Sequence, residues 1–401
     1  MNKTLKPGWS YKKLNELGFV GRGKSKHRPR NEPSLYGGKH PFIQTAEVTA
    51  SEFYIIKYSQ TYSDLGLAQS KLWDKNTLCI VNAGENTAET AILKFQACFP
   101  DSIIGFIADS EKADVRFIKY YLTTIKPQLR SITKGATQDN LSVSKLLLFD
   151  ILTPPLPIQR KIAGILSAYD RLIENNTRRI EILEEMARSI YREWFVKFRF
   201  PGHEQAQMVD SELGLIPEGW EVGRLDDALI LQRGFDLPTQ QRKEGNIPIY
   251  ASTGITGTHN EAKIKAPGVV TGRSGSLGTV IYVDEDYWPL NTTLWVKEFR
   301  RVTPLYAFYL LSDLKLEQYN SGAAVPTLNR NDIHGQPVVL PPQRILEQLN
   351  LFVEPLLVLK KNLLKRSDNL RQTRDLVLPR LISGKIDLEK INIGVYNAEN
   401  N

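Results

Sequence analysis

Between residues 156 and 200, apolar side chains recur at alternating steps of four and three residues. The positions that carry this pattern are Ile162, Leu166, Tyr169, Ile173, Ile180, Leu183, Ala187, Ile190 and Trp194. This is the heptad spacing of a helix that buries one seam, so the segment is predicted to form one long helix. Asn176 fills the one gap in the series, and the other faces are rich in Arg, Lys and Glu. Such a helix needs a partner along its seam.

A second segment near the C-terminus follows the same stepping. Its predicted seam is Leu349, Phe352, Leu356, Leu359, Leu363, Leu370 and Val377, interrupted by Arg366 and Thr373. Each segment follows a proline pair, Pro154-Pro155 or Pro341-Pro342, which ends a strand-like run and suits entry into a helix. We therefore predict a helix pair; the alternative is two unrelated surface helices on separate cores. Pro355 predicts a bend in the second helix or a start near Glu354.

The chain contains an internal repeat. Gly8-Trp9 recurs as Gly219-Trp220, and Arg22-Gly23 recurs as Arg233-Gly234 at the same offset. Each half is therefore predicted to be a globular region of mixed helices and strands followed by a long helix. Because the sequences between these landmarks differ, the halves fit two recognition modules for different targets. Divergence without different ligands is the alternative.

Composition sets the outer limits for this 401-residue chain. Its length predicts at least two domains, and its net charge of +8 favours a polyanionic partner. The two cysteines, Cys79 and Cys98, are expected to be free and buried. No apolar run approaches membrane-spanning length, so we expect a soluble, cytoplasmic protein.

The segment Gly18 to Ser25 matches the phosphate-binding P-loop pattern, and Leu146 to Asp150 resembles the acidic strand of such enzymes. A P-loop delivers phosphates to the start of a helix, so a helix must follow Ser25. The segment that follows contains Pro29 and Pro33 and cannot be such a helix. A nucleotide hydrolase is therefore the disfavoured rival interpretation.

The same region is better described as a basic loop held open by glycines and prolines. Its candidate phosphate- and base-contacting residues are Arg22, Lys24, Lys26, His27, Arg28 and Arg30. In the second half, Arg233, Arg273 and Ser274 lie in glycine-rich stretches where backbone can approach DNA closely. A solvated charged loop and a tight hairpin without special function are the alternatives.

The sequence shows no catalytic constellation. The five histidines lack metal-ligand spacing, and no Gly-x-Ser-x-Gly elbow, nuclease signature or amino-methyltransferase motif is present. The first helix ends in Trp194, Phe195, Phe198 and Phe200, which are too many large apolar groups for an exposed terminus. They are expected either to dock a partner subunit or to cover the adjacent domain.

These features resemble the specificity subunit of bacterial type I restriction-modification systems over essentially the whole chain. The match rests on Pro154 to Asp170, Leu172 to Asn176, Tyr191 to Phe195, Pro341 to Arg344 and Leu378 to Lys385, and Arg22 to Arg30 with Pro41 to Thr45 resembles one recurring type of recognition domain. The resemblance implies a mixed α/β (α+β) fold, with two target recognition domains separated by two long antiparallel helices in a coiled coil. The predicted divisions are recognition domain 1 (1–153), helix 1 (154–200), linker and recognition domain 2 (201–340), helix 2 (341–386) and a flexible tail (387–401).

The resemblance also implies a function. Each recognition domain would read one half of an interrupted DNA target, while the helices set the spacing and dock two methyltransferase subunits. Those partners would bind S-adenosylmethionine and methylate adenine at N6, and restriction subunits bound through them would use ATP and Mg²⁺. No cofactor or metal is expected in this chain, which would be non-catalytic by itself.

Two groups of site residues follow from this interpretation. The DNA-contacting candidates are Arg22, Lys24, Lys26, His27, Arg28, Arg30, Gln44, Arg233, Tyr250, Arg273 and Ser274, and the subunit-docking candidates are Trp194, Phe195 and Phe198. The second rival, besides the nucleotide hydrolase, is a helical scaffold that binds DNA without sequence preference.

Overall fold

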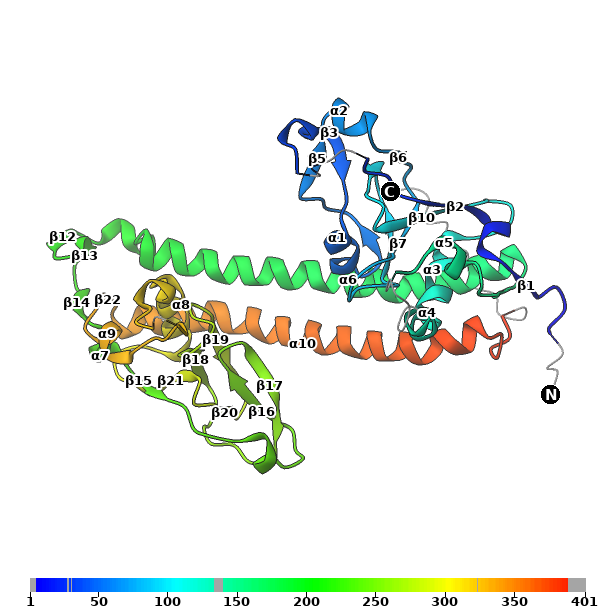
Figure 1. The fold of residues 1–401 in the computed structure, drawn as a ribbon. Coiled ribbons are helices and arrows are strands. Elements are labelled where there is room, and N and C mark those ends of the chain that lie inside the picture. The colour runs from blue at the N-terminus through cyan, green and yellow to red at the C-terminus, as the bar shows by residue number, and fades with distance from the viewer. Residues whose placement is uncertain (1–4, 27–28, 30, 133–139, 323, 389–401) are drawn as a thin grey trace. The chain divides into compact units, whose positions relative to one another are not determined.

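The structure is a computed structural model that describes residues 5–26, 29, 31–132, 140–322 and 324–388. The chain divides into two compact units (Figure 1). Unit 1 comprises residues 1–177 and 365–401, and unit 2 comprises residues 178–364. The two long helices, α6 (Leu156–Tyr191) and α10 (Gln343–Ile382), each contribute a segment to both units.

Unit 1 is built around two mixed sheets and a short strand pair. The five-stranded sheet has the order β2 (Gly18–Arg22), β10 (Ile103–Ala108), β7 (Leu78–Val81), β8 (Thr90–Leu93) and β4 (Tyr54–Ile55). The four-stranded sheet has the order β5 (Gln60–Tyr62), β3 (Tyr36–Phe42), β9 (Ala97–Cys98) and β6 (Leu72–Trp73). The remaining elements are β1 (Ser10–Lys12), β11 (Ile151–Thr153), α1 (Thr45–Ala50), α2 (Asp64–Ala68), α3 (Val115–Thr124), α4 (Lys126–Ser131) and α5 (Val143–Leu146).

The central strand β7 shows how the core of unit 1 forms. Alternate side chains of a strand point to opposite faces of its sheet. Leu78 and Ile80 pack towards α3 and the long helices, whereas Cys79 and Val81 pack against Trp73 and its neighbours. All four side chains of β7 are therefore buried. Both cysteines are free and buried, as the sequence predicted.

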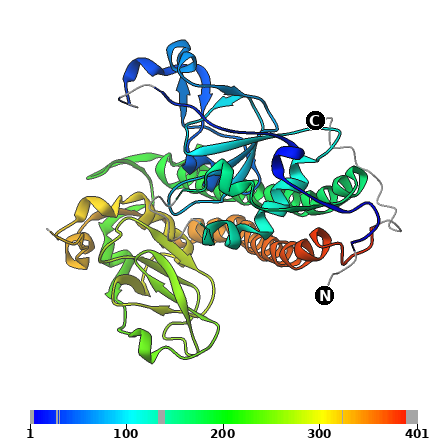
Figure 2. The same ribbon diagram turned by 45° about the vertical axis from the view of Figure 1, so that its right-hand side comes forward.

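Unit 2 repeats this plan with different strands (Figure 2). Its four-stranded sheet has the order β15 (Leu229–Arg233), β21 (Thr293–Phe299), β18 (Gly268–Gly272) and β19 (Val280–Val283), and its three-stranded sheet has the order β17 (Gly254–His259), β16 (Ile247–Ala251) and β20 (Trp288–Pro289). The remaining elements are β12 (Met208–Ser211), β13 (Gly214–Pro217), β14 (Glu221–Arg224), β22 (Pro337–Leu340), α7 (Leu225–Ala228), α8 (Pro304–Asp313) and α9 (Arg330–His334).

The repeat predicted from the sequence is visible in how each long helix begins. In unit 1, β1 follows Gly8-Trp9 and pairs antiparallel with β11, which leads into α6. In unit 2, β14 follows Gly219-Trp220 and pairs antiparallel with β22, which leads into α10. Each proline pair therefore ends a strand and lets the chain turn into a helix, as predicted.

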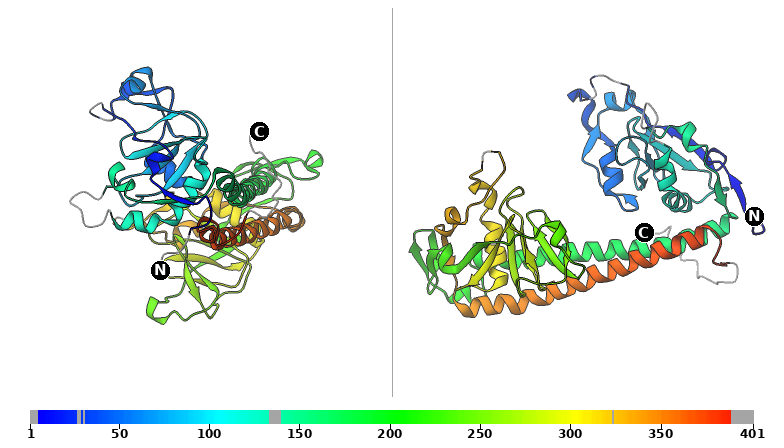
Figure 3. Two further views of the ribbon diagram at one scale, coloured as in Figure 1. Left: turned by 90° about the vertical axis from the view of Figure 1, so that its right-hand side faces the viewer. Right: turned by 60° about the horizontal axis from the view of Figure 1, so that its bottom comes forward.

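Within each unit the segments of α6 and α10 run antiparallel, side by side (Figures 1 and 3). In unit 1, Asn176 donates to the Ser367 hydroxyl at 3.1 Å, and Asp170 pairs with Arg374 seven residues further along α10. In unit 2, Lys360 pairs with Glu184 at 2.6 Å. The predicted seam of α6 is confirmed. Its buried positions are Ile162, Leu166, Ile173, Leu183, Ala187 and the gap residue Asn176, and Tyr169, Ile180 and Ile190 are half-buried. Trp194, which is also buried, lies in the turn Arg192–Val196 that follows α6.

Two of the seven predicted seam positions of α10 are wrong. Phe352 and Leu359 remain 56% and 49% exposed, whereas the neighbouring Val353 is buried. Continuing from Val353 at seven-residue intervals, the seam uses Lys360, Ser367 and Arg374. These polar residues can face α6 because each has a polar partner on that helix. The apolar pattern of α10 alone does not predict these partners.

Two further expectations need correction. The second helix begins at Gln343 and continues through Pro355, so it does not start near Glu354. Pro355 is exposed, which places the hydrogen bond that proline cannot make on the solvent side. The first part of the predicted linker and recognition domain 2, Pro201 to Glu218, is not an unstructured linker, because it contains the hairpin β12–β13, whose turn uses Gly214 at φ +93°.

Candidate nucleic-acid interface

The two Arg-Gly repeats occupy equivalent places in their sheets. Each lies where an edge strand ends and the chain turns, and we call this place the corner of the sheet. Arg22 ends β2 and lies opposite Ile104 of β10, and Arg233 ends β15 and lies opposite Leu294 of β21. The following glycines are confined, because an added Cβ would lie 2.2 Å from a backbone oxygen, that of Pro100 at Gly23 and that of Leu290 at Gly234. A larger residue would displace the turn, which explains why Gly follows Arg in both halves.

In unit 1 this corner is fixed by backbone hydrogen bonds. Gly23 donates to the Ile103 carbonyl at 2.8 Å, and Lys24 donates to the Phe99 carbonyl at 3.0 Å. The Arg22 guanidinium donates to the Asp101 carbonyl at 3.1 and 2.8 Å, which directs an exposed cation along the surface of the corner. The segment is therefore a rigid base from which charged side chains project.

These contacts remove the basis of the nucleotide-binding alternative. A P-loop needs free backbone amides and a helix directly after it. Here residues 18–22 form a β-strand, the amides of Gly23 and Lys24 are bonded to protein carbonyls, and the Lys26 amide is bonded to Gln69. Among the described residues that follow Ser25, the first helical turn is at Pro33–Leu35.

The other predicted residues of unit 1 are only partly brought together. Lys24 is half-buried and Lys26 is exposed, both next to Gln69 and Ser70 after α2. Gln44 is exposed at the start of α1, where its side chain donates to Gln60 of β5 at 2.7 Å. His27, Arg28 and Arg30 lie outside the described residues.

Sequence reasoning missed an exposed aromatic group beside this corner. Phe19 of β2 is about half exposed, and the Lys71 ammonium lies 4.4 Å from its ring centroid and 3.8 Å from that of Trp73. Partial burial lowers the pKa of Lys71. An exposed ring beside a cation suits contact with nucleic acid, whose bases stack and whose phosphates are anionic. The sequence places Phe19 shortly before the Arg-Gly landmark, but only the fold decides that its ring faces outward.

In unit 2 the structure gathers three predicted residues at one end of the four-stranded sheet. Gly272 pairs with Thr293 of β21, next to the residue opposite Arg233, so Arg273 and Arg233 flank the start of β21. Arg273 and Ser274 both donate from their amides to the Thr292 carbonyl, at 2.8 and 3.1 Å. The Arg273 guanidinium reaches the Asn291 carbonyl at 3.4 Å, and Arg233 pairs with Asp236 at 3.7 Å.

Tyr250 does not lie with Arg233, Arg273 and Ser274. Its side chain is 6% exposed and packs with Val270, Tyr287 and Trp295. Burial raises the pKa of Tyr250 to about 12. We therefore assign Tyr250 to the core of unit 2 and remove it from the candidate contacts. The sequence did not show this, because a tyrosine on a short strand can face either side of a sheet.

The aromatic end of the first helix is also core. Phe195 lies 4.8 Å from Tyr306 and 5.7 Å from Trp220 between ring centroids, and Phe198 lies 5.4 Å from Trp220. Trp194 and Phe195 are buried and Phe198 is half-buried. Of the two roles expected for these residues, covering the adjacent domain is the one that the structure supports, and their assignment to subunit docking is corrected.

We expect Phe195→Ala to lower the free energy of unfolding by about 3–5 kcal/mol, because it leaves a cavity among packed rings. The measurement is denaturant unfolding of the full chain. Val196→Ala, at the exposed neighbouring position, is the matched control and should change stability little. A Phe195→Ala chain of unchanged stability would restore a docking role for this side chain.

Two general findings bear on function. Among the described residues, none of the helices is both long and apolar enough to cross a membrane. The same residues include no group of three or more His, Cys, Asp or Glu side chains that could hold a metal ion.

Comparison with known proteins identifies the family. The type I restriction modification DNA specificity domain matches residues 6–185 and 217–365. The type I restriction enzyme MjaIX specificity subunit of Methanocaldococcus jannaschii is 26% identical, over 96% of this chain and 94% of that protein. The MjaVIII specificity subunit of the same organism is 28% identical over 49% of this chain and 47% of that protein.

A solved structure shares the fold. The crystal structure of the type I restriction-modification S subunit from M. genitalium aligns with a TM-score of 0.63 and 19% identity, covering 94% of this chain and 98% of that one. The family match falls on both halves of the internal repeat and spans most of the sequence. The chain therefore belongs to the family of type I restriction-modification DNA specificity subunits, with two target recognition domains.

Proposed function

We propose that this chain supplies DNA sequence recognition to a type I restriction-modification complex. The recognition domain of unit 1 would read one half of an interrupted target, and that of unit 2 the other half. The observation that carries the proposal is the repeated Arg-Gly corner, which presents Arg22 in one unit and Arg233 with Arg273 in the other. Arginine can bind phosphate or read guanine with two hydrogen bonds, and the different loops around the corners suit different half-sites.

The chemistry of the complex is assigned to partner subunits. We propose that two methyltransferase subunits, binding S-adenosylmethionine, methylate adenine at N6 within the recognised site. ATP and Mg²⁺ would be used by restriction subunits bound through them. A base that undergoes such chemistry is taken out of the stack, so this chain would hold the distorted duplex while a partner acts.

The experiment that tests the function is a map of methylated bases in cells that carry this chain with its modification subunits. We expect one interrupted motif, with two constant half-sequences separated by a constant number of unspecified bases. Deleting the gene for this chain should remove that methylation. Methylation at an uninterrupted motif, or methylation that persists without the chain, would contradict the proposal.

The basic corner of unit 1 makes a second test possible. We expect Lys24→Ala with Lys26→Ala to weaken DNA binding and to reduce the slope of log K against log salt by about two, because each lost phosphate contact releases one fewer counterion. Lys365→Ala with Lys385→Ala makes the same charge change at two exposed positions. Lys365 is the first residue of the unit 1 segment of α10, and Lys385 lies three residues after the end of that helix. This control should leave the slope nearly unchanged. Equal loss in both variants would mean that net charge, not the corner, binds DNA.

Docking of a methyltransferase fits an exposed apolar face of α10 better than the buried aromatic cluster. This outer apolar face consists of Leu351, Phe352, Pro355, Val358 and Leu359. Leu351, Pro355 and Val358 lie on the side of the helix opposite the seam positions Leu349 and Val353. Phe352 and Leu359 flank the seam, and the Phe352 ring lies 5.5 Å from that of Trp194. Leu351 is 74% exposed, which is unusual for a large apolar residue unless a partner covers it.

We expect Leu351→Lys with Val358→Lys to weaken assembly with the methyltransferase more than about tenfold, because two charges would be buried in an apolar interface. DNA binding and the unfolding midpoint of the isolated chain should stay unchanged, since both side chains are exposed. Leu148→Lys, at another exposed leucine, is the control. Analytical ultracentrifugation of the mixed subunits would measure the effect. Undiminished assembly would place the docking surface elsewhere.

A further inference from the structure

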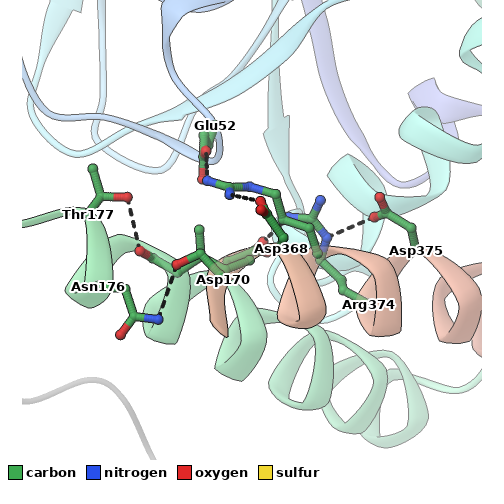
Figure 4. Close-up of polar contacts among 10 residues, drawn as sticks. Glu52, Asp170, Asn176, Thr177, Asp368, Arg374 and Asp375 are labelled. Atoms are coloured by element: carbon green, nitrogen blue, oxygen red, sulfur yellow. Dashed lines mark hydrogen bonds and ion pairs between the residues drawn. The ribbon is translucent and has the colours of Figure 1, made fainter. Parts of the chain in front are cut away.

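The globular part of unit 1 is attached to its own helix segments through a shared apolar core and through buried polar groups. Asp170 of α6 accepts a hydrogen bond from the Tyr120 hydroxyl of α3. The same carboxylate pairs with Arg374 of α10 at 2.5 Å, as Figure 4 shows. We call Tyr120, Asp170 and Arg374 the Asp170 joint, because Asp170 links the recognition domain to both helices.

Tyr120 and Asp170 of the Asp170 joint are buried, so Asp170 needs charged and hydrogen-bonding partners. Tyr120 is 3% exposed and Asp170 is 8% exposed. A buried carboxylate is costly unless a cation and hydrogen-bond donors surround it, and removing one partner leaves an uncompensated charge. Burial, together with the Asp170 carboxylate, raises the pKa of Tyr120 well above its ordinary value, so the hydroxyl keeps the proton that it donates. Without Asp170 the Tyr120 hydroxyl would lose its acceptor, and Arg374 would be left with its contact with Asp375 at 3.0 Å.

A second link lies next to the first (Figure 4). Arg371 donates to the Glu52 carboxylate at 2.9 Å and to Asp368 at 3.4 Å. Lys119, the neighbour of Tyr120 on α3, donates to the Glu52 carbonyl at 3.2 Å. Burial lowers the pKa of Lys119 to about 8. The loop after α1 is thereby tied to α10 through Glu52, in the same region as the Asp170 joint.

Unit 2 has an apolar contact at the equivalent place, beside the polar contacts of Lys361 with Asp284 at 2.8 Å and of Thr303 with Asn350 at 3.1 Å. The segment Phe117 to Leu122 of α3 resembles Tyr306 to Leu311 of α8, so Tyr309 corresponds to Tyr120. The Tyr309 ring stacks on Tyr191 of α6 at 5.1 Å. Tyr191 also packs against Phe195 and Tyr306. This contact is apolar, whereas the Asp170 joint uses directed bonds between charged groups. A planar guanidinium and a hydroxyl accept few orientations, while stacked rings tolerate small sliding.

We propose that the Asp170 joint fixes the angle at which recognition domain 1 is held on the helix pair, and that Tyr120, Asp170 and Arg374 are positioning residues for the half-site which that domain reads. The inference rests on the proposed function. Base recognition depends on hydrogen bonds that form only within a narrow range of distances and angles. A domain whose orientation on the helices varies therefore discriminates less between the correct and the wrong base. Loosening the joint should therefore cost discrimination at one half-site.

The test uses the full chain assembled with its methyltransferase subunits and duplexes with randomised half-sites. We expect Asp170→Asn and Tyr120→Phe each to reduce base discrimination at the first half-site roughly tenfold, while the second half-site is read as before. The first half-site is the one that stays when residues 178–364 are exchanged. Glu184→Gln is the matched control, because it breaks the ion pair with Lys360 between the helices without touching either domain. It should leave both half-sites unchanged.

Three outcomes decide the proposal. Selective loss at the first half-site supports it, as does partial recovery in the charge-swapped pair Asp170→Arg with Arg374→Asp. Equal loss at both half-sites, or unchanged discrimination in a folded Tyr120→Phe chain, overturns it. Tyr120→Phe keeps the ring packing, so it decides the matter if Asp170→Asn does not fold. Failure of the unaltered complex to recognise any interrupted motif would instead overturn the proposed function.

Discussion

Exchanging residues 178–364 for the corresponding residues of a related specificity subunit is expected to replace one half of the methylated motif and leave the other half unchanged. The reason is that these residues form one compact unit with its own core, including the corner that presents Arg233 and Arg273. The preference should switch by roughly a thousandfold, the lower end of the ratio by which specific DNA binding exceeds non-specific binding. Mapping methylated sites in cells that carry the hybrid would measure it.

The boundaries of the exchange matter because the core of unit 2 includes the end of α6. Phe195 and Tyr191 pack against Trp220, Tyr306 and Tyr309. A narrower exchange of residues 201–340 would bring unmatched rings together, so we expect the same new half-site in a less stable chain. A hybrid that changes both half-sites, or neither, would show that the two units do not read DNA independently.

Lengthening both long helices by one heptad is expected to lengthen the gap between the two half-sequences. Seven residues inserted after Thr177 in α6 and seven after Leu364 in α10 add about 10 Å of helix, which corresponds to roughly three base pairs. Both insertions fall at the boundary between the units. Seven residues keep the four-and-three seam in phase, and inserting into both helices preserves the bonds of Asn176 to Ser367 and of Lys360 to Glu184. An insertion in one helix would mismatch these polar layers.

The measurement is again the methylated motif, which should keep both half-sequences and gain about three unspecified bases. As a control, seven residues inserted in the β12–β13 turn after Glu212 lengthen the chain without lengthening either helix. That variant should keep the original gap. If the lengthened helices fold and the complex still methylates at the original spacing, the helix pair does not set the distance between the half-sites.

The spacing of apolar residues, prolines and glycines along the sequence determined the repeated architecture of this chain. The seam of α6, the strand-proline-helix entries and the paired Gly-Trp and Arg-Gly landmarks depend on neighbours in sequence, so they could be predicted from the residues. The rejection of a P-loop was of the same kind, because prolines exclude a helix wherever the chain folds. The turns that carry Arg22, Arg233, Arg273 and Ser274 could be predicted for the same reason, since glycines beside arginines are typical of turns; the DNA contacts of these residues stay a prediction.

Tertiary structure decided which of several locally equivalent residues face the core. On α10 the sequence favoured Phe352 and Leu359 because they are apolar, but Lys360, Ser367 and Arg374 face α6 because Glu184, Asn176 and Asp170 receive them. Tyr250 and Phe195 were likewise taken for contact residues, and they are buried by strands and rings far away in sequence. The Asp170 joint could not be predicted from the sequence for the same physical reason. A buried charge is stabilised by partners that only folding brings within hydrogen-bond distance. Because those partners lie on other segments, the periodicity of one segment does not predict them.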